Sequence, residues 1–145
     1  FKAKNNVTIT EIFKFLFKPK VKTIGNQFIS SMHEQDDFLK INLKDNSILY
    51  WPLQYGKHGI YQVISETFDK NDWHYYQKKH TEISTGEIVV DVGAAEGLFL
   101  LSVVDKCDKV IVIEPNDLFF KCLHKTFKPY LNKVELINAA VGSKQ

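Results

Sequence analysis

Carboxylates and small residues alternate in the stretch Glu87–Gly97 (EIVVDVGAAEG), in a pattern that suits nucleotide binding. Asp91 stands two residues before Gly93, and Ala95 and Gly97 follow at alternate positions. Small residues let the backbone approach a ligand closely, while a carboxylate accepts hydrogen bonds from the ligand's amino or hydroxyl groups. The pattern therefore favours a nucleotide-binding loop over an ordinary tight turn between a strand and a helix.

A second carboxylate, Glu114, ends the apolar segment Lys109–Glu114 (KVIVIE), about 20 residues beyond Gly93. In nucleotide-binding folds, an acid at about this spacing accepts hydrogen bonds from the ribose hydroxyls. A carboxylate suits a diol because it only accepts hydrogen bonds and has room for both hydroxyls. The spacing favours ribose binding over a solvated acid that merely closes a strand.

These acids need a frame of strands and helices to position them. The run Ile88–Val90 is apolar at consecutive positions, as in a parallel strand covered by helices on both faces. An apolar stretch of helical length follows the loop, and a second helix begins near Asn116, a plausible N-cap. The sequence therefore predicts an α/β, Rossmann-like parallel sheet with the following elements: strand 87–91, helix Leu98–Val104, strand Lys109–Glu114, helix Asn116–Phe127 and strand Lys133–Asn138.

The spacing also bears on the kind of nucleotide. A dinucleotide fingerprint needs small residues at the first, third and sixth loop positions, which are Gly93, Ala95 and Leu98. Leu98 does not fit, because the sixth position must let the helix pack close to the strand. A nicotinamide-dependent oxidoreductase domain is therefore the second interpretation, and a non-catalytic Rossmann-like module is the third.

Three segments, VVDVGAAEGLFLLSV, VIVIEPN and VELINAAVG, closely resemble the FkbM-type family of S-adenosylmethionine (SAM) dependent methyltransferases. The resemblance covers roughly residues 86–142, and a weaker one extends over the acid-plus-aromatic segment Ser65–Tyr76. It implies a class I methyltransferase fold, SAM as cofactor, and O-methylation of a sugar or other hydroxylated small molecule. The sequence differs from the family at Ala95, where family members usually carry Asn.

The resemblance also implies how SAM would be held. Asp91 and the loop would bind its amino-acid end, Glu114 its ribose, and the turn after the third strand its adenine. No catalytic base is identified, because catalytic groups in this fold usually follow a fourth strand. The predicted cofactor-binding residues are Asp91, Gly93, Ala94, Ala95, Glu96, Gly97, Glu114, Pro115, Asn138 and Ala139.

We expect the chain to divide into an extension over residues 1–55 and a truncated SAM-binding domain over residues 56–145. In the extension, Thr8–Phe17 (TITEIFKFLF) opens with a capping box and forms an amphipathic helix. We expect its apolar face to pack on the domain, in preference to a membrane surface. Alternating residues in Asp37–Leu43 and Ser47–Leu53 predict a β-hairpin.

Two further helices are predicted between the hairpin and the first parallel strand. The first covers Ile60–Glu66 and the second Asp72–Lys79 (DWHYYQKK). The aromatic residues of this region are interpreted as packing rather than as a sugar-binding surface. Because the histidines show no metal-ligand spacing, no metal site is predicted.

Composition narrows the choice of partner. The chain has 145 residues, 44% of them hydrophobic, and a net charge of +2. All 19 basic residues are lysines, so there is no guanidinium fork for guanine or phosphate. On this ground we expect a small-molecule acceptor and no nucleic acid.

The two cysteines, Cys107 and Cys122, lack the spacing of a disulfide framework or a metal site. With no membrane-spanning run and no recognisable signal peptide, they favour a reducing cytoplasm. The first parallel strand would form an open sheet edge, which we expect to pair with another chain or to cost stability. The chain is thus interpreted as the cofactor-binding half of a longer enzyme.

Overall fold

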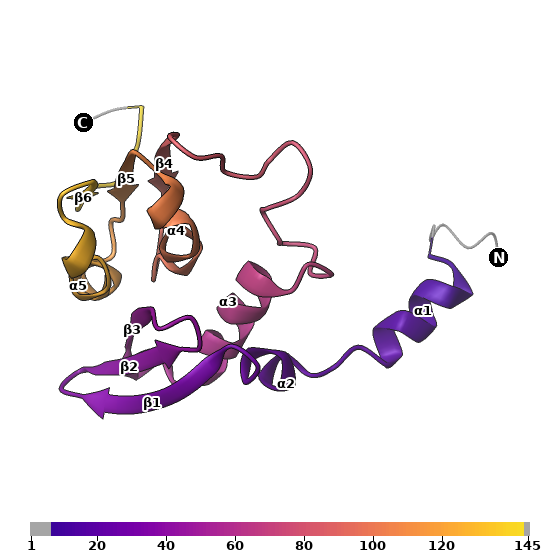
Figure 1. The fold of residues 1–145 in the computed structure, drawn as a ribbon. Coiled ribbons are helices and arrows are strands. Elements are labelled where there is room, and N and C mark those ends of the chain that lie inside the picture. Colours follow the sequence, from indigo (N-terminus) through magenta and orange to yellow (C-terminus); the bar gives the residue numbers. More distant parts are fainter. Residues whose placement is uncertain (1–6, 144–145) are drawn as a thin grey trace.

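The computed structural model describes residues 7–143 as two three-stranded sheets with helices packed between and beside them (Figure 1). One sheet is parallel and its strands are hydrogen-bonded in chain order: β4 (Ile88–Val92), β5 (Lys109–Ile113) and β6 (Val134–Ile137). The connections run through α4 (Leu98–Val103), η2 (Val104–Lys106), α5 (Asp117–Thr126) and η3 (Lys128–Tyr130). This arrangement confirms the predicted α/β, Rossmann-like parallel sheet.

The parallel sheet is covered on one face. Val110 and Val112 of β5 point into the core, where they meet the buried side chains of α4 and α5. On the opposite face of β4, Ile88, Val90 and Val92 are 67%, 55% and 56% exposed. The expectation that helices cover both faces is therefore wrong for residues 7–143, since the second apolar face of β4 meets no helix there.

The second sheet is antiparallel, in the order β1-β2-β3. Its hairpin confirms the predicted one, with Asp45 Oδ1 accepting a hydrogen bond from Ser47 N–H at 2.9 Å in the turn. The strand β1 was not predicted, because its sequence ISSMHEQ lacks alternation and its pairing with β2 is irregular between Ile29 and Ser31. The strands are β1 (Ile29–Gln35), β2 (Phe38–Leu43) and β3 (Ile48–Pro52), followed by η1 (Leu53–Tyr55).

One hydrophobic core joins the two sheets. The helix α3 (His58–Phe68) extends the predicted helix by two residues at each end and buries Ile60 and Ile64 against the antiparallel sheet. On the other side, β3 lies along α5, and Tyr50 N–H donates a hydrogen bond to Thr126 Oγ1 at 3.0 Å. The core is continuous across residue 55, and the division into two domains there stays a prediction.

Residues 72–79 do not form the predicted helix; a bend and turn at residues 72–74 lead into an irregular segment over residues 75–78. Asp72 Oδ1 accepts a hydrogen bond from the backbone N–H of His74 at 3.0 Å, and Thr81 Oγ1 donates to the carbonyl of Tyr76. Such local bonds between side chains and backbone offer the chain an alternative to helical hydrogen bonding.

The predicted N-terminal helix is present as α1 (Ile9–Leu16) and carries its capping box. Glu11 Oε2 accepts from Thr8 N–H at 2.7 Å, and Thr8 Oγ1 accepts from Glu11 N–H at 3.3 Å. The expected packing on the domain is wrong, because α1 projects away from the body (Figure 1). An extended segment around Pro19 separates it from α2 (Val21–Gly25), which packs on α3 instead.

Candidate functional site

The loop between β4 and α4 is built from three residues in the left-handed backbone region. The φ angles of Gly93, Ala95 and Gly97 are +81°, +47° and +75°. Gly93 N–H donates to the Ile113 carbonyl at 2.8 Å, and Gly97 N–H donates to the Ala94 carbonyl at 2.9 Å. Alternating small residues thus fold the chain tightly over the ends of β4 and β5.

Gly97 is fixed by packing as well as by its backbone angle. A Cβ atom at this position would lie 2.6 Å from Leu123 Cδ2 and 2.8 Å from Phe127 Cε2, both on or beside α5. Only glycine lets the loop and the start of α4 approach α5 this closely.

Ala95 occupies a conformation that is unfavourable for an alanine. A φ of +47° brings the Cβ close to the following carbonyl oxygen, at a cost of about 1 kcal/mol. Asparagine, the usual residue of the resembling family here, tolerates this region better. Ala95 therefore adds backbone strain to the loop.

Glu114 holds the loop through both of its carboxylate oxygens. Oε2 accepts a hydrogen bond from Ala95 N–H at 2.8 Å, and Oε1 accepts from Asn116 N–H at 2.7 Å. The residue is 5% exposed. Each carboxylate oxygen has a second lone pair, so a ribose hydroxyl remains a feasible further donor. Ribose binding by Glu114 stays a prediction, and the structure adds a loop-supporting role that sequence spacing did not indicate.

Asp91 lies on the covered face of β4, beside Glu114. It is half-buried, and its register partner on β5 is Val112. Burial raises the pKa of Asp91, and the negative charge of Glu114 raises it further. The two predicted acids therefore share one site.

Glu96 is the most strongly perturbed acid of the loop. Burial raises its pKa to about 7, against the opposing effect of the backbone N–H groups of Glu96 and Leu98. The charges of Glu66 and Asp91 act in the same direction as burial and are included in this value. Protonation of Glu96 is thus finely balanced near neutral pH.

The remaining predicted residues lie at the same end of the sheet. Glu114 N–H donates to the Ile137 carbonyl at 3.0 Å, so the turn with Asn138 and Ala139 begins beside Glu114. Asn138 Nδ2 donates to Asp117 Oδ1 at 2.9 Å. Ala94 is half-buried, whereas Pro115, Asn138 and Ala139 are exposed. Their contacts with a cofactor stay a prediction.

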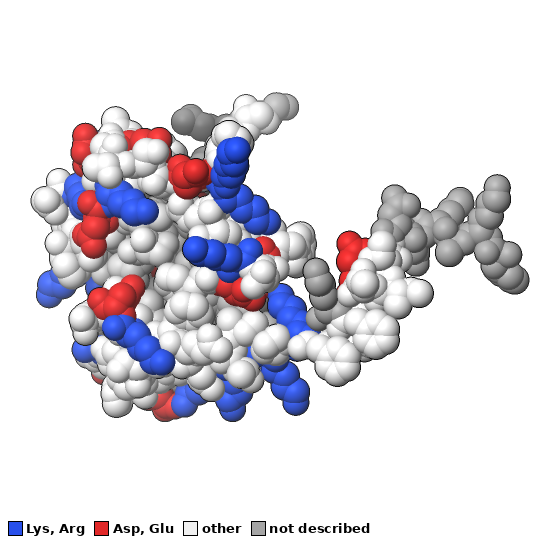
Figure 2. Space-filling view, turned by 45° about the vertical axis from the view of Figure 1, so that its right-hand side comes forward, with Lys and Arg blue, Asp and Glu red and all other residues white. Residues whose placement is uncertain are grey.

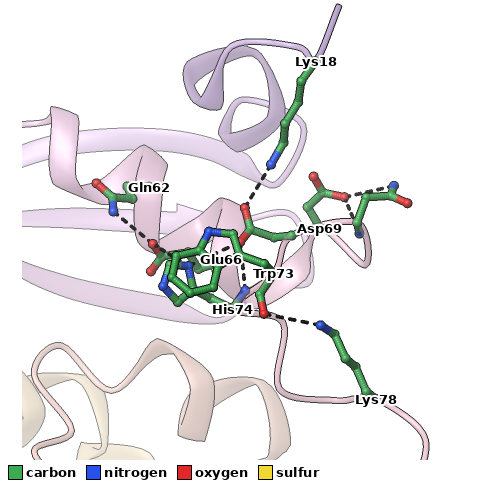
Figure 3. A network of polar contacts seen from close by, with 9 residues as sticks. Lys18, Gln62, Glu66, Asp69, Trp73, His74 and Lys78 are labelled. Carbon is green, nitrogen blue, oxygen red and sulfur yellow. Dashed lines mark hydrogen bonds and ion pairs between the residues drawn. The ribbon is translucent and has the colours of Figure 1, made fainter. Parts of the chain in front are cut away.

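Sequence reasoning did not place Glu66 in the site. This residue of α3 approaches the loop closely enough to raise the pKa of Glu96. It accepts a hydrogen bond from Gln62 Nε2 at 2.9 Å, and His74 Nδ1 lies 3.4 Å from its Oε1 (Figure 3). The sequence feature that could have indicated Glu66 is the acid-plus-aromatic segment that begins at Ser65. Its side chains could not be placed in the site from sequence alone, because their position depends on the tertiary contact between α3 and α4.

The same network continues to the base of α1. Asp72 is buried and forms an ion pair with Lys18, Nζ to Oδ2 at 3.2 Å (Figure 3). Burial raises the pKa of Asp72, but the His74 N–H and the Lys18 ammonium outweigh it, so the pKa is lowered overall. Further along the segment, the rings of Tyr76 and Phe99 lie 5.2 Å apart, which ties it to α4.

The cysteines and the other polar groups of residues 7–143 show no further reactive centre. Cys107 and Cys122 are buried free thiols, and burial raises the pKa of both, that of Cys122 to about 12. Three or more His, Cys, Asp or Glu side chains do not gather anywhere in this range in a way that could hold a metal ion. Within the same residues, every helix is too short or too polar to cross a membrane.

Comparison with known proteins gives matches in structure alone. No model of a protein family matches the chain, and no curated protein matches it. Trm5b of Pyrococcus abyssi is similar over 75% of this chain and 34% of its own, with 16% identity and a TM-score of 0.46. The M. jannaschii tRNA m1G37 methyltransferase is similar over 76% of this chain and 28% of its own, with 16% identity and a TM-score of 0.37.

A third similar structure is spermidine synthase of Thermotoga maritima, with 16% identity and a TM-score of 0.33 over 77% of this chain and 41% of its own. This chain thus spans between about a quarter and two fifths of these proteins. At such identities the likeness concerns the general fold and assigns no substrate.

The expectation that excluded nucleic acid as a partner is corrected by these matches. The M. jannaschii protein among them is by name a tRNA m1G37 methyltransferase, an enzyme that acts on nucleic acid. The absence of arginine was a weak reason for the exclusion, because lysine also binds phosphate, as a point charge.

Proposed function

We propose that this chain is the cofactor-binding part of a SAM-dependent methyltransferase of the FkbM type. By that resemblance, the methyl acceptor is a hydroxyl oxygen of a sugar or another hydroxylated compound. A cytoplasmic location belongs to the same proposal, since both cysteines are free thiols. The observation that carries the proposal is the group of acids around the loop at the carboxyl ends of β4 and β5.

These acids favour a cationic ligand. Asp91 and Glu96 have raised pKa values because burial and neighbouring carboxylates disfavour their charged forms. A cation placed between them would relieve this repulsion. SAM brings a sulfonium and an ammonium group and has no phosphate, whereas a nicotinamide dinucleotide brings an anionic pyrophosphate. The electrostatics of the loop thus support SAM over the dinucleotide.

Each part of the site would position one part of the cofactor. Asp91 and the loop backbone would bind the amino-acid end of the cofactor, and Glu114 would accept from the ribose. Asn138 and Ala139 would border the adenine. Methyl transfer from a sulfonium is an in-line displacement, in which the acceptor oxygen forms a bond to the methyl carbon as the bond to sulfur breaks. Holding the methyl group in line with the acceptor is the main contribution of such a site.

Calorimetric titration with S-adenosylhomocysteine tests the proposal, with NAD as the comparison ligand. We expect the wild-type chain to bind S-adenosylhomocysteine and not NAD. Asp91→Asn should weaken this binding at least about tenfold, because it removes a charged partner of the ligand's ammonium group. Asn keeps the size of the side chain and should leave the fold intact.

The matched control is Glu135→Gln, an exposed acid of β6 that pairs with Lys109 at 2.7 Å, outside the predicted site. It should bind as the wild type does. Binding of NAD in place of S-adenosylhomocysteine would contradict the proposal, as would an Asp91→Asn variant with unchanged affinity.

A further inference from the structure

The helix α1 carries a wide apolar face that the body does not cover. Its apolar residues occupy one side of the helix, and Thr10 and Glu11 lie on the other. Exposure is 73% for Ile9 and 78% for both Phe15 and Phe17. Residues 7–18, which comprise α1 and its flanking residues, are called the arm. Its other exposed apolar side chains are Val7, Ile12, Phe13 and Leu16.

The arm is joined to the body at its base. The ion pair between Lys18 and Asp72 fixes the end of the arm, and beyond it a hollow of about 1000 Å³ is bordered by Phe15 and Phe17 on one side and Phe28 and Phe68 on another. Figure 2 shows the apolar arm projecting from the body, with lysines gathered where it joins. The apolar side chains of the arm are thus exposed, with Phe15 and Phe17 also bordering this hollow.

Charge is distributed unevenly between the segment that contains the arm and the rest of the chain. Residues 1–22 contain six lysines and one acid, a net charge of +5. Residues 23–145 contain thirteen lysines and sixteen acids, a net charge of −3. The basic charge of the protein is therefore concentrated at the segment that exposes aromatic side chains.

We propose that α1 is an interfacial helix that binds the protein to an anionic lipid surface. A helix of this kind inserts its apolar face at the boundary between headgroups and acyl chains, and lysines beside it are attracted to anionic headgroups. A nucleic acid would satisfy the lysines and leave the Phe, Ile and Leu side chains exposed to water. A lipid surface takes both, and the body, with its net negative charge, remains on the aqueous side.

Sedimentation of the whole chain with lipid vesicles tests this proposal, using phosphatidylcholine vesicles with and without 30% phosphatidylserine, roughly the anionic content at which such attraction operates. We expect the protein to bind the anionic vesicles and this binding to weaken in 0.5 M salt. The reason is that the electrostatic screening length there is on the order of threefold shorter than at low salt. Phe13→Ser with Leu16→Ser should weaken binding at least about tenfold, because it removes inserted side chains. Lys20→Gln with Lys22→Gln should weaken it about fivefold per lysine.

Matched controls change residues of the same types elsewhere. Leu131→Ser removes an exposed apolar side chain outside α1, and Lys44→Gln with Lys121→Gln removes two exposed lysines. Both controls should bind vesicles as the wild type does. Circular dichroism and the binding of S-adenosylhomocysteine should be unchanged in the Phe13 and Leu16 variant, because neither side chain contributes to the core.

Three results would overturn the proposal. The first is equal binding to neutral and anionic vesicles, or no binding to either. The second is a dimer in analytical ultracentrifugation that the Phe13 and Leu16 variant abolishes, since the apolar face would then be covered by a second copy. The third is binding to RNA that persists in that variant and displaces the vesicles.

Discussion

The two sheets each have three strands, but they differ in how their apolar side chains are covered. In the antiparallel sheet, the central strand β2 buries Leu39, Ile41 and Leu43 in the hydrophobic core. In the parallel sheet, β4 stands at the edge, and its outward face is more than half exposed. The apolar face of the antiparallel sheet is covered within residues 7–143, whereas β4 of the parallel sheet stands at an edge with one apolar face exposed.

The two sheets therefore have different roles, one mainly in stability and the other in the candidate site. The antiparallel sheet supplies core residues, and its strand β3 packs on α5, one of the helices that connect the strands of the parallel sheet. The parallel sheet carries the acids and the left-handed loop at its strand ends, where ligands bind in open α/β sheets. Substitutions in the two sheets should therefore have different consequences.

The largest expected effect is on stability in the antiparallel sheet. Ile41→Ala should lower the free energy of unfolding by about 2 to 5 kcal/mol, because it leaves a cavity at a fully buried position. Val90→Ala, on the exposed face of β4, should cost less than about 1 kcal/mol. Urea denaturation measures both. A comparable loss in the two variants would show that the outer face of β4 is covered in solution.

A smaller effect, dependent on pH, is expected in the loop of the parallel sheet. The pKa of Glu96 is raised from 4.5 to about 7 in the folded protein, so the native state binds more protons than the unfolded state between these values. Stability therefore falls as the pH rises from 4.5 to 7, and the loss persists above that range. Below pH 4.5 both states are protonated and the effect vanishes.

Glu96→Gln should remove this penalty because an amide carries no charge to desolvate. We expect the variant to be more stable than the wild type at pH 8, by at most about 3 kcal/mol, and no more stable at pH 4. Thermal unfolding at the two pH values measures the difference, with Glu135→Gln as the exposed control. If Glu96→Gln is more stable than the wild type by the same amount at both pH values, the explanation by burial of the Glu96 carboxylate is wrong.

The smallest expected effect concerns the backbone of the loop. Ala95→Asn should raise the free energy of unfolding by up to about 1 kcal/mol, because asparagine tolerates the positive φ angle at this position. Ala140→Asn, at an exposed position without a positive φ angle, serves as the control and should change stability little. Denaturant titration measures the stability of both variants. If neither gains stability, the positive φ angle assigned to residue 95 is wrong.

Local signals in the sequence predicted much of the parallel sheet. The acids, the glycines and the apolar runs place three strands and two helices in order, since each element carries its own start or stop. Asn116 is an example, because its side chain accepts hydrogen bonds from Leu118 N–H and Phe119 N–H, as expected of an N-cap. The hairpin was predictable for the same reason, from alternation on either side of a polar turn.

The features that sequence reasoning missed depend on contacts between distant segments. The exposure of α1 could not be inferred from its amphipathic pattern, because the same pattern suits a core and a lipid surface. Glu66 reaches the loop through the packing of α3 beside α4, and Glu114 supports Ala95 across 19 residues. The irregular course of residues 72–79 arises because side chains of Asp72 and Thr81 bind the backbone in place of helical partners.

The most direct test of the account is to find where S-adenosylhomocysteine binds, by following backbone amide resonances of the labelled chain during a titration. The account predicts shifts at Gly93, Ala95 and Gly97 and beside Glu114, with the amides of the antiparallel strand β2 unchanged. Shifts confined to the antiparallel sheet, or none at saturating ligand, would contradict the assignment of the loop between β4 and α4 as the cofactor site.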